Sequence, residues 1–182
     1  MHQMAAKSLW EAFVSKSAIF AMSVLAFAGA AQAQTAPAGP QPRARGPSLA
    51  LSVEAAQTAV ATCLGNGYKV SAQVFDSGGA PVVILSGDGV GARTVDIATT
   101  KAAVVLKYKV ASSVIVDKAK TDAALAADLK ADPKIGIARA GSVPVTVGGD
   151  FIGAIAVSGA PGGDKDQVCA QAGLDKVAAR LK

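Results

Sequence analysis

Residues Ile152–Gly173 read IGAIAVSGAPGGDKDQVCAQAG, and this stretch carries the clearest indication of the fold. It begins as a strand of small apolar residues, turns through a Gly/Pro loop and continues as a helix that carries Cys169. The small side chains of Ala154, Ala156 and Ser158 allow another element to approach one face of the strand closely. That element is a helix of the same chain, a second subunit or a flat ligand, and the pattern does not choose among them.

The N-terminal residues 1–33 have the features of a secretory signal peptide. Lys7 and Lys16 flank a leader whose apolar run is too short to span a bilayer comfortably. A small-x-small site follows at residues 31–33, so we expect cleavage after Ala33. The prediction is a periplasmic or secreted protein without a membrane span after cleavage; the alternative is an uncleaved membrane anchor.

Cleavage would remove the side chains most often used in catalysis and metal binding. The leader holds the only histidine, the only tryptophan and all three methionines: His2, Trp10, Met1, Met4 and Met22. Histidine-based catalysis, histidine-ligated metal sites and His or Met axial ligands for haem are thereby excluded from the mature chain. The formal net charge falls from +5 to +4 without Lys7, Lys16 and Glu11. No basic cluster is interleaved with aromatics, so nucleic acid is not an expected partner.

Residues 34–47 contain four prolines and almost no bulky apolar side chains. Such a segment buries too little surface to offset the entropy of ordering it, so we predict a disordered Pro-rich linker. A single domain then occupies residues 48–182.

The first predicted helix begins at Ser52 as its N-cap, with Glu54 in the first turn. Its apolar positions repeat at helical spacing and predict one buried face: Ala56, Ala59, Val60, Cys63 and Leu64. The sequence Gly65-Asn66-Gly67 ends this helix.

Two hairpins separated by helices follow from the remaining pattern. Alternating apolar residues predict strands over 68–76 and 81–86, and again over 142–147 and 151–159. In the last strand, Phe151, Ile155 and Val157 share one predicted face, and Ile152 joins the small residues on the other. A further helical stretch runs from about Ser113 to Ala131, and the last helix starts near Asp164. The predicted fold class is α+β, with an antiparallel sheet of about five strands flanked by helices.

The central helix carries a lysine within its apolar stripe. Thr94 is its predicted N-cap, Asp96 lies in the first turn, and the stripe comprises Ile97, Ala98, Val104, Val105 and Tyr108. Lys101 lies in the middle of this stripe, so its ammonium either snorkels to solvent or pairs with a carboxylate. The predicted partner is Asp166, with Asp76 and Asp96 as alternatives. The preceding glycines at 87, 89 and 91 resemble a phosphate cradle only weakly.

An exported chain with two cysteines is expected to pair them. Cys63 lies near the end of the first predicted helix and Cys169 near the start of the last. If these helices are antiparallel neighbours, the two ends meet and form a disulfide with a Cα separation under about 7 Å. The alternative is two buried free thiols. No histidine is available to activate either thiol for catalysis.

Four segments together resemble the GlcG-like and HbpS-like haem-binding family, whose domain also forms the C-terminal part of PduO-type proteins. They are FDSGGAPVVILSGDGV (75–90), TVDIATTKAAVV (94–105), GSVPVTVGGDFIGAIAVSGA (141–160) and DKDQVCAQAGLDKV (164–177). The resemblance extends from about Leu49 to Val177. It implies an antiparallel sheet with flanking helices, assembly into dimers or larger homo-oligomers, haem binding and, in some members, slow oxidative haem breakdown. The family's aspartate at the start of the last helix matches Asp166.

The chain departs from the family pattern at two positions. Val104 stands where the family often has a threonine, and Ala156 stands where the strand usually has a second glycine. A haem contact made by the threonine hydroxyl would be absent here.

We expect a homo-oligomeric haem-binding protein, with cofactor-binding candidates Tyr108, Lys101, Arg93 and Lys107. Tyr108 is the preferred iron ligand because phenolate is an established haem ligand, and Tyr68 is the alternative. Arg93, Lys107 and Arg139 are available for the propionates. Two other functions stay open, a slow haem-degrading enzyme and an accessory oligomeric protein without a small-molecule site.

Overall fold

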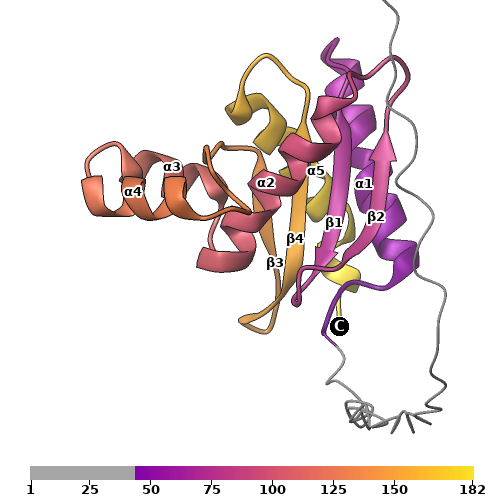
Figure 1. Cartoon of the computed structure of the whole chain (residues 1–182). Coiled ribbons are helices and arrows are strands. Elements are labelled where there is room, and N and C mark those ends of the chain that lie inside the picture. Colours follow the sequence, from indigo (N-terminus) through magenta and orange to yellow (C-terminus); the bar gives the residue numbers. More distant parts are fainter. Residues whose placement is uncertain (1–43) are drawn as a thin grey trace, which may run out of the picture. The chain divides into compact units, whose positions relative to one another are not determined.

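The computed structural model describes residues 44–182, which fold as an α+β domain (Figure 1). The predicted signal peptide and most of the predicted linker, residues 1–43, lie outside the described residues. The helices are α1 (Leu49–Gly65), α2 (Arg93–Tyr108), α3 (Ser112–Ala119), α4 (Ala123–Ala131), α5 (Gly163–Val177) and a 3₁₀ turn, η1 (Ala178–Arg180). The strands are β1 (Ser71–Asp76), β2 (Pro81–Ser86), β3 (Ser142–Val147) and β4 (Asp150–Ser158).

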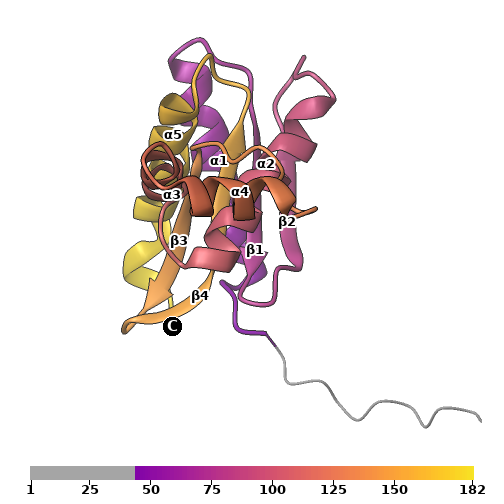
Figure 2. The ribbon, with the colours of Figure 1, turned by 60° about the vertical axis from the view of Figure 1, so that its left-hand side comes forward.

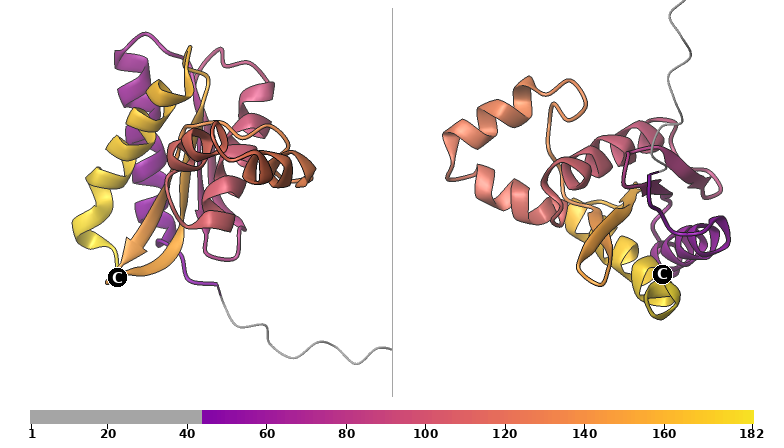
Figure 3. Two further views of the ribbon diagram at one scale, coloured as in Figure 1. Left: turned by 90° about the vertical axis from the view of Figure 1, so that its left-hand side faces the viewer. Right: turned by 90° about the horizontal axis from the view of Figure 1, so that it is seen from below.

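The four strands form one antiparallel sheet in the order β2-β1-β4-β3. The two predicted hairpins are therefore present, joined through the central pair β1–β4, and the sheet has four strands rather than about five. Helices α1 and α5 pack against each other and cover one face, whereas α2 covers the other (Figures 1 and 2). The α3–α4 pair extends from the end of α2 away from the sheet (Figure 3).

A bulge in β4 corrects the predicted assignment of faces. The β3–β4 register shifts between Val145 and Thr146, so that Ile152 has no partner in the ladder. The shift places Ile152 with Ile155 and Val157 in the core beneath α1 and α5, instead of on the small face. Strict alternation could not predict this, because one inserted residue reverses the order of the faces.

The small face of β4 is covered by a helix of the same chain. Ala156 packs with Ala98 and Ala102 of α2 and with Phe75 of β1. Of the three partners that the sequence left open for this face, the structure provides the first.

Two predicted helix starts were wrong. Ser48, not Ser52, is the N-cap of α1: its Oγ accepts a hydrogen bond from Leu51 N at 3.4 Å, and Ser52 is buried inside the helix. Thr94 lies within α2, where its hydroxyl donates to Gly91 O at 2.8 Å, and Ala92 is the capping residue. Ser and Thr favour both caps and turns, so the residue type alone does not distinguish neighbouring positions.

The helical stretch predicted over 113–131 is interrupted. The helix ends at Ala119 and a new one begins at Ala123. Asp122 caps α4 by accepting a hydrogen bond from Leu125 N at 2.9 Å.

The last residues of the predicted linker contact the domain. Arg45 O accepts a hydrogen bond from Ser77 N at 2.8 Å, and the Arg45 side chain forms an ion pair with Asp150 at 2.7 Å. Within residues 44–182, none of the helices is both long and apolar enough to cross a bilayer.

Candidate functional site

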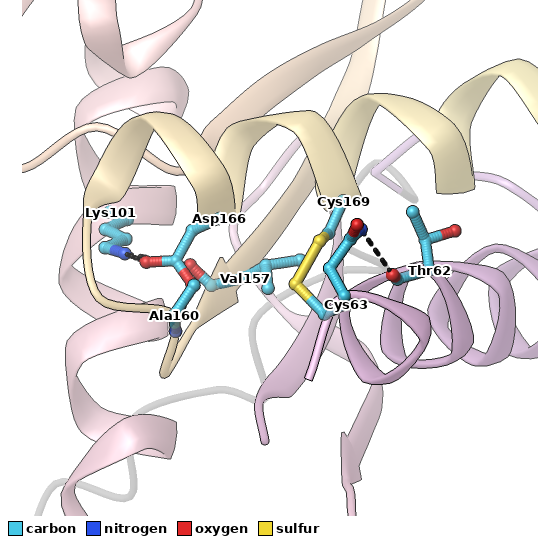
Figure 4. The surroundings of a disulfide bond; sticks show 8 residues. Thr62, Cys63, Lys101, Val157, Ala160, Asp166 and Cys169 are labelled. Atoms are coloured by element: carbon cyan, nitrogen blue, oxygen red, sulfur yellow. Dashed lines mark hydrogen bonds and ion pairs between the residues drawn. A yellow bond between two sulfur atoms is a disulfide. The ribbon is translucent and has the colours of Figure 1, made fainter. Parts of the chain in front are cut away.

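A buried ion pair links α2 to the start of α5. Lys101 Nζ lies 2.5 Å from Asp166 Oδ2 and donates to Val157 O at 3.0 Å, while Asp166 Oδ1 accepts from Ala160 N at 2.9 Å (Figure 4). Both side chains are almost fully buried, at 2% and 4% exposure. The predicted partner of Lys101 is therefore found, and the side chain does not snorkel.

Burial sets the protonation chemistry of this pair. Loss of hydration lowers the pKa of Lys101, and the neighbouring Asp166 carboxylate opposes that shift. Loss of hydration likewise raises the pKa of Asp166, against the hydrogen bond from Lys101. Each charge is thus held in the interior by its partner and by one backbone group.

Cys63 and Cys169 form the predicted disulfide between α1 and α5, with a Cα separation of 5.6 Å (Figure 4). Both residues are buried in the core between these helices and the sheet. The alternative of two free thiols is excluded for these two cysteines.

A cavity of about 690 Å³, here called the α2 cleft, lies beside α2. Its apolar walls come from β1, from α2 and from the loop after α4: Phe75, Ala103, Leu106, Pro133 and Ile135. Thr99, Lys107, Asp132 and Lys134 add polar groups. A mostly apolar cleft of this size with a few polar groups is typical of a small-molecule or cofactor site.

Lys107 lies at the cleft within a small charge network. Its ammonium is 3.0 Å from both Asp128 Oδ2 and Asp132 Oδ2, which connects α2 to α4. Hydrogen bonds to Asp132 and Asp128 raise the pKa of Lys107, so it stays cationic. Hydrogen bonds from Lys107 correspondingly lower the pKa values of Asp128 and Asp132.

Tyr108 does not line the α2 cleft. Its ring packs against the cluster formed by Ile115, Leu129 and their neighbours, and its hydroxyl donates to Asp128 Oδ2 at 3.1 Å. Burial raises the pKa of Tyr108, which disfavours the phenolate that would bind iron. Arg93 is exposed at the start of α2, and Tyr68 borders a third, smaller hollow beside Lys69.

A second cavity, here called the α5 cavity, is about 490 Å³ and lies where α2, α5 and the end of β4 meet. Its lining includes Lys101, Asp166 and Arg139. The four predicted cofactor-binding residues are therefore not brought together: Lys101 lies at this cavity, Lys107 at the α2 cleft, and Tyr108 and Arg93 at neither.

Sequence reasoning missed most of the cleft wall. Phe75 belonged to a predicted strand, and Pro133, Lys134 and Ile135 to an unassigned loop. The available signal was Asp132-Pro133, which ends α4 and directs the next residues back across α2. Val104, at the position where the family often has a threonine, is fully buried against Ile115 and Leu129.

A family model described as "Haem degrading protein HbpS-like" matches residues 48–175. The chain belongs to the HbpS-like family. Its structure is similar to the crystal structure of HbpS, with 31% identity, a TM-score of 0.68 and coverage of 79% of this chain and 98% of HbpS. A double mutant of Streptomyces reticuli HbpS matches equally well, at 31% identity and a TM-score of 0.68, over 79% of this chain and 94% of that one. No curated protein matches the chain.

A solved structure with lower sequence identity has a similar fold. The structure of the PduOC:Heme complex is similar at 18% identity and a TM-score of 0.63, covering 73% of this chain and 94% of that chain. At this identity the likeness shows the fold alone. The HbpS-like family member described here and PduOC therefore share the antiparallel sheet with flanking helices that the sequence predicted.

Proposed function

We propose that the protein binds haem, or a related flat cofactor, in the α2 cleft, and that it is exported and homo-oligomeric. The family description supports a haem-related role. The leader-like N-terminus and the disulfide support export, since disulfides persist in oxidising compartments. The resemblance to the family supports self-assembly.

The observation that carries this proposal is the composition of the α2 cleft. A flat macrocycle with an apolar body matches Phe75, Leu106 and Ile135, which line the cleft. Its carboxylates match the two lysines, Lys107 and Lys134. Lys107 already forms ion pairs with Asp128 and Asp132. Of the two lysines that line the cleft, Lys134 is therefore the one available to pair with a ligand carboxylate.

The α2 cleft offers apolar surface for the haem macrocycle but few side chains that could ligate the iron. Within residues 44–182 there is no histidine, methionine or free cysteine, and no group of acidic residues suited to a metal ion. Thr99, Lys107, Asp132 and Lys134 supply the polar side chains of the cleft. Tyr108 would have to release Asp128 to reach it. We therefore expect weak binding carried by apolar contact and charge, with haem readily lost.

A haem titration of the purified protein tests the proposal. We expect a saturable change in the Soret band, weakened by Lys134→Glu because the substitution places a negative charge beside the propionates. Lys118→Glu on the exposed side of α3 makes the same change in net charge away from the cleft and serves as the control. Tyr108→Phe should leave the band unchanged if the cleft alone holds haem; an altered ligand band would make Tyr108 the iron ligand.

The same titration separates the alternative functions. A flat Soret response would favour the accessory oligomeric protein without a small-molecule site. Slow loss of the band with peroxide, in wild type but not in haem alone, would favour the haem-degrading enzyme. Light scattering of the purified protein measures the oligomeric state, and fractionation of expressing cells measures export.

A further inference from the structure

The α5 cavity differs from the α2 cleft in place and in chemistry. It is about 490 Å³ and is built from the first half of α2, the segment before β3, the end of β4 and the start of α5. Thr94, Ile97 and Lys101 line it from α2, whereas Thr99, Ala103 and Leu106 of the same helix line the cleft. At about 3.6 residues per turn, these two sets lie on opposite faces of α2.

The charged side chains of the α5 cavity sum to one positive charge. Lys101 and Asp166 neutralise each other at 2.5 Å, and Arg139 is the third charged residue in the lining. Arg139 is half-buried, and its guanidinium donates to Ile137 O at 3.2 Å. Among residues 44–182, no carboxylate lies within salt-bridge distance of Arg139. Arg139 lines the same cavity as Lys101, and after burial its charge also lowers the pKa of Lys101.

Both cations keep hydrogen-bonding capacity. An ammonium has three N–H groups, and Lys101 uses two of them, on Val157 O and Asp166 Oδ2. A guanidinium has five N–H groups in a planar fork that matches a carboxylate, and one contact to Ile137 leaves most of them available. Ser158 lines the same cavity.

Apart from Thr94 and Ser158, the uncharged side chains of the lining are apolar. Ile97, Val116, Ala138 and Ala160 surround the charged groups without another charged side chain among them. An inorganic anion would leave these surfaces without a partner, whereas an organic acid with a short apolar body would cover them. Asp164 raises the pKa of Asp166 but is not among the residues that line the cavity.

From this geometry we infer that the α5 cavity is a binding site for a small organic carboxylate. The carboxylate pairs with Arg139 and takes the remaining hydrogen bond of Lys101, and its apolar body contacts Ile97 and Val116. The site is separate from the α2 cleft and does not depend on haem.

Titration of the purified protein with butyrate, followed by amide NMR, tests this site. We expect saturable shifts at the amides of Gly159, Ala160 and Gly163, which border the cavity. Butyramide has the same shape without the charge, and inorganic phosphate has the charge without the apolar body, so both should bind at least roughly tenfold more weakly.

Variants assign the binding to Arg139. Arg139→Gln removes the guanidinium from a half-buried position outside the core and should weaken butyrate binding by roughly tenfold or more. Arg180→Gln is the matched control, because Arg180 lies in the C-terminal turn and pairs with Glu54. The inference is overturned if Arg139→Gln binds butyrate like wild type, if butyramide or phosphate binds as well as butyrate, or if the shifts appear at Leu106 and Lys134 of the cleft instead.

Discussion

At the scale of single residues, the buried pair Lys101–Asp166 shows how one side chain determines the placement of others. Lys101 lies at an apolar position of α2, so folding brings a charge into the interior. An unpaired buried ammonium would cost free energy, so Lys101 needs partners in the interior. They are the Asp166 carboxylate at the start of α5 and the carbonyl of Val157 on β4. One charge therefore fixes the relative position of three elements.

Removing one partner should be more damaging than removing both. Lys101→Met leaves Asp166 buried without its cation, and we expect a loss of about 3–5 kcal/mol in the free energy of unfolding. Lys101→Met combined with Asp166→Leu leaves no buried charge and should lose less. Urea unfolding of wild type and both variants measures this. A Lys101→Met protein as stable as wild type would contradict the structural role of the pair.

The network around Lys107 predicts that the stability of the folded protein decreases at low pH. Hydrogen bonds from Lys107 lower the pKa values of Asp128 and Asp132 below their ordinary 3.8, so both folded values lie below the unfolded ones. The stabilisation is complete above pH 3.8 and is lost as the pH falls through the lowered folded values.

In Lys107→Gln, the pKa of Asp128 should rise toward 3.8. The pKa of Asp132 should rise as well, and neither should reach 3.8, since the Tyr108 hydroxyl still donates to Asp128 and the amide of Lys134 still donates to Asp132. Carboxyl-carbon NMR titration measures both values, with Asp122 as an internal reference because its carboxylate has no lysine partner among the described contacts. Unchanged titration of Asp128 in the variant would show that Lys107 does not control it.

At the scale of elements, α1 and α5 approach each other unusually closely. A Cβ added to Gly173 would lie 2.5 Å from Ala55 O and 3.2 Å from the Cβ of Ala59. Cys169 and Gly173 are one turn apart on α5, as are Ala59 and Cys63 on α1, so the disulfide and the close contact lie in consecutive layers of one antiparallel helix pair.

Gly173→Ala should therefore force these helices apart. We expect a loss of about 1–3 kcal/mol, because the added methyl meets backbone that cannot move without shifting α1. Gly65→Ala is the control at the end of α1, where an added Cβ meets nothing within 4 Å and a better helix former is introduced. Thermal melts of the two variants should differ in direction; equal melting temperatures would show that the helix pair adjusts freely.

The same elements show what the sequence could and could not predict. Periodicity and the expected compartment favoured the α1–α5 disulfide over two free thiols, and Asp166 over Asp76 and Asp96 as the partner of Lys101. Both pairs are present in the structure, because each depends on one helix end meeting another element. The N-cap at Ser48 and the bulge at Ile152 were missed, because each depends on a one-residue or few-residue shift that periodicity does not register.

At the scale of the whole molecule, α2 divides the candidate chemistry into two sites. One face of α2 lines the α2 cleft and the other lines the α5 cavity. Lys107 and Lys101, which the sequence analysis named together as cofactor-binding candidates, therefore lie at different sites. The cleft could not be predicted because Pro133, Lys134 and Ile135 reach it only through the fold of the α3–α4 pair. Asp132-Pro133 marks the end of α4, but no local pattern indicates which element the loop after it contacts.

The disulfide closes the chain around both sites. Cys63 and Cys169 are 106 residues apart, so the closed loop contains the whole sheet, α2 and the α3–α4 pair. A crosslink over a loop of this length restricts the unfolded chain strongly.

Removing that crosslink should lower the stability of the entire domain rather than of one helix. For Cys63→Ala with Cys169→Ala we expect a loss of about 2–5 kcal/mol in the free energy of unfolding, from the greater entropy of the unfolded chain and the smaller buried side chains. In the presence of a reductant, the urea midpoint of wild type should fall toward that of the double variant, whereas the midpoint of the variant should not change.

The folded protein should resist the reductant. Because both sulfurs are buried, wild type without urea should be reduced only slowly. Equal urea midpoints for oxidised and reduced wild type would show that packing of α1 on α5, and not the covalent link, holds the two ends of the domain together.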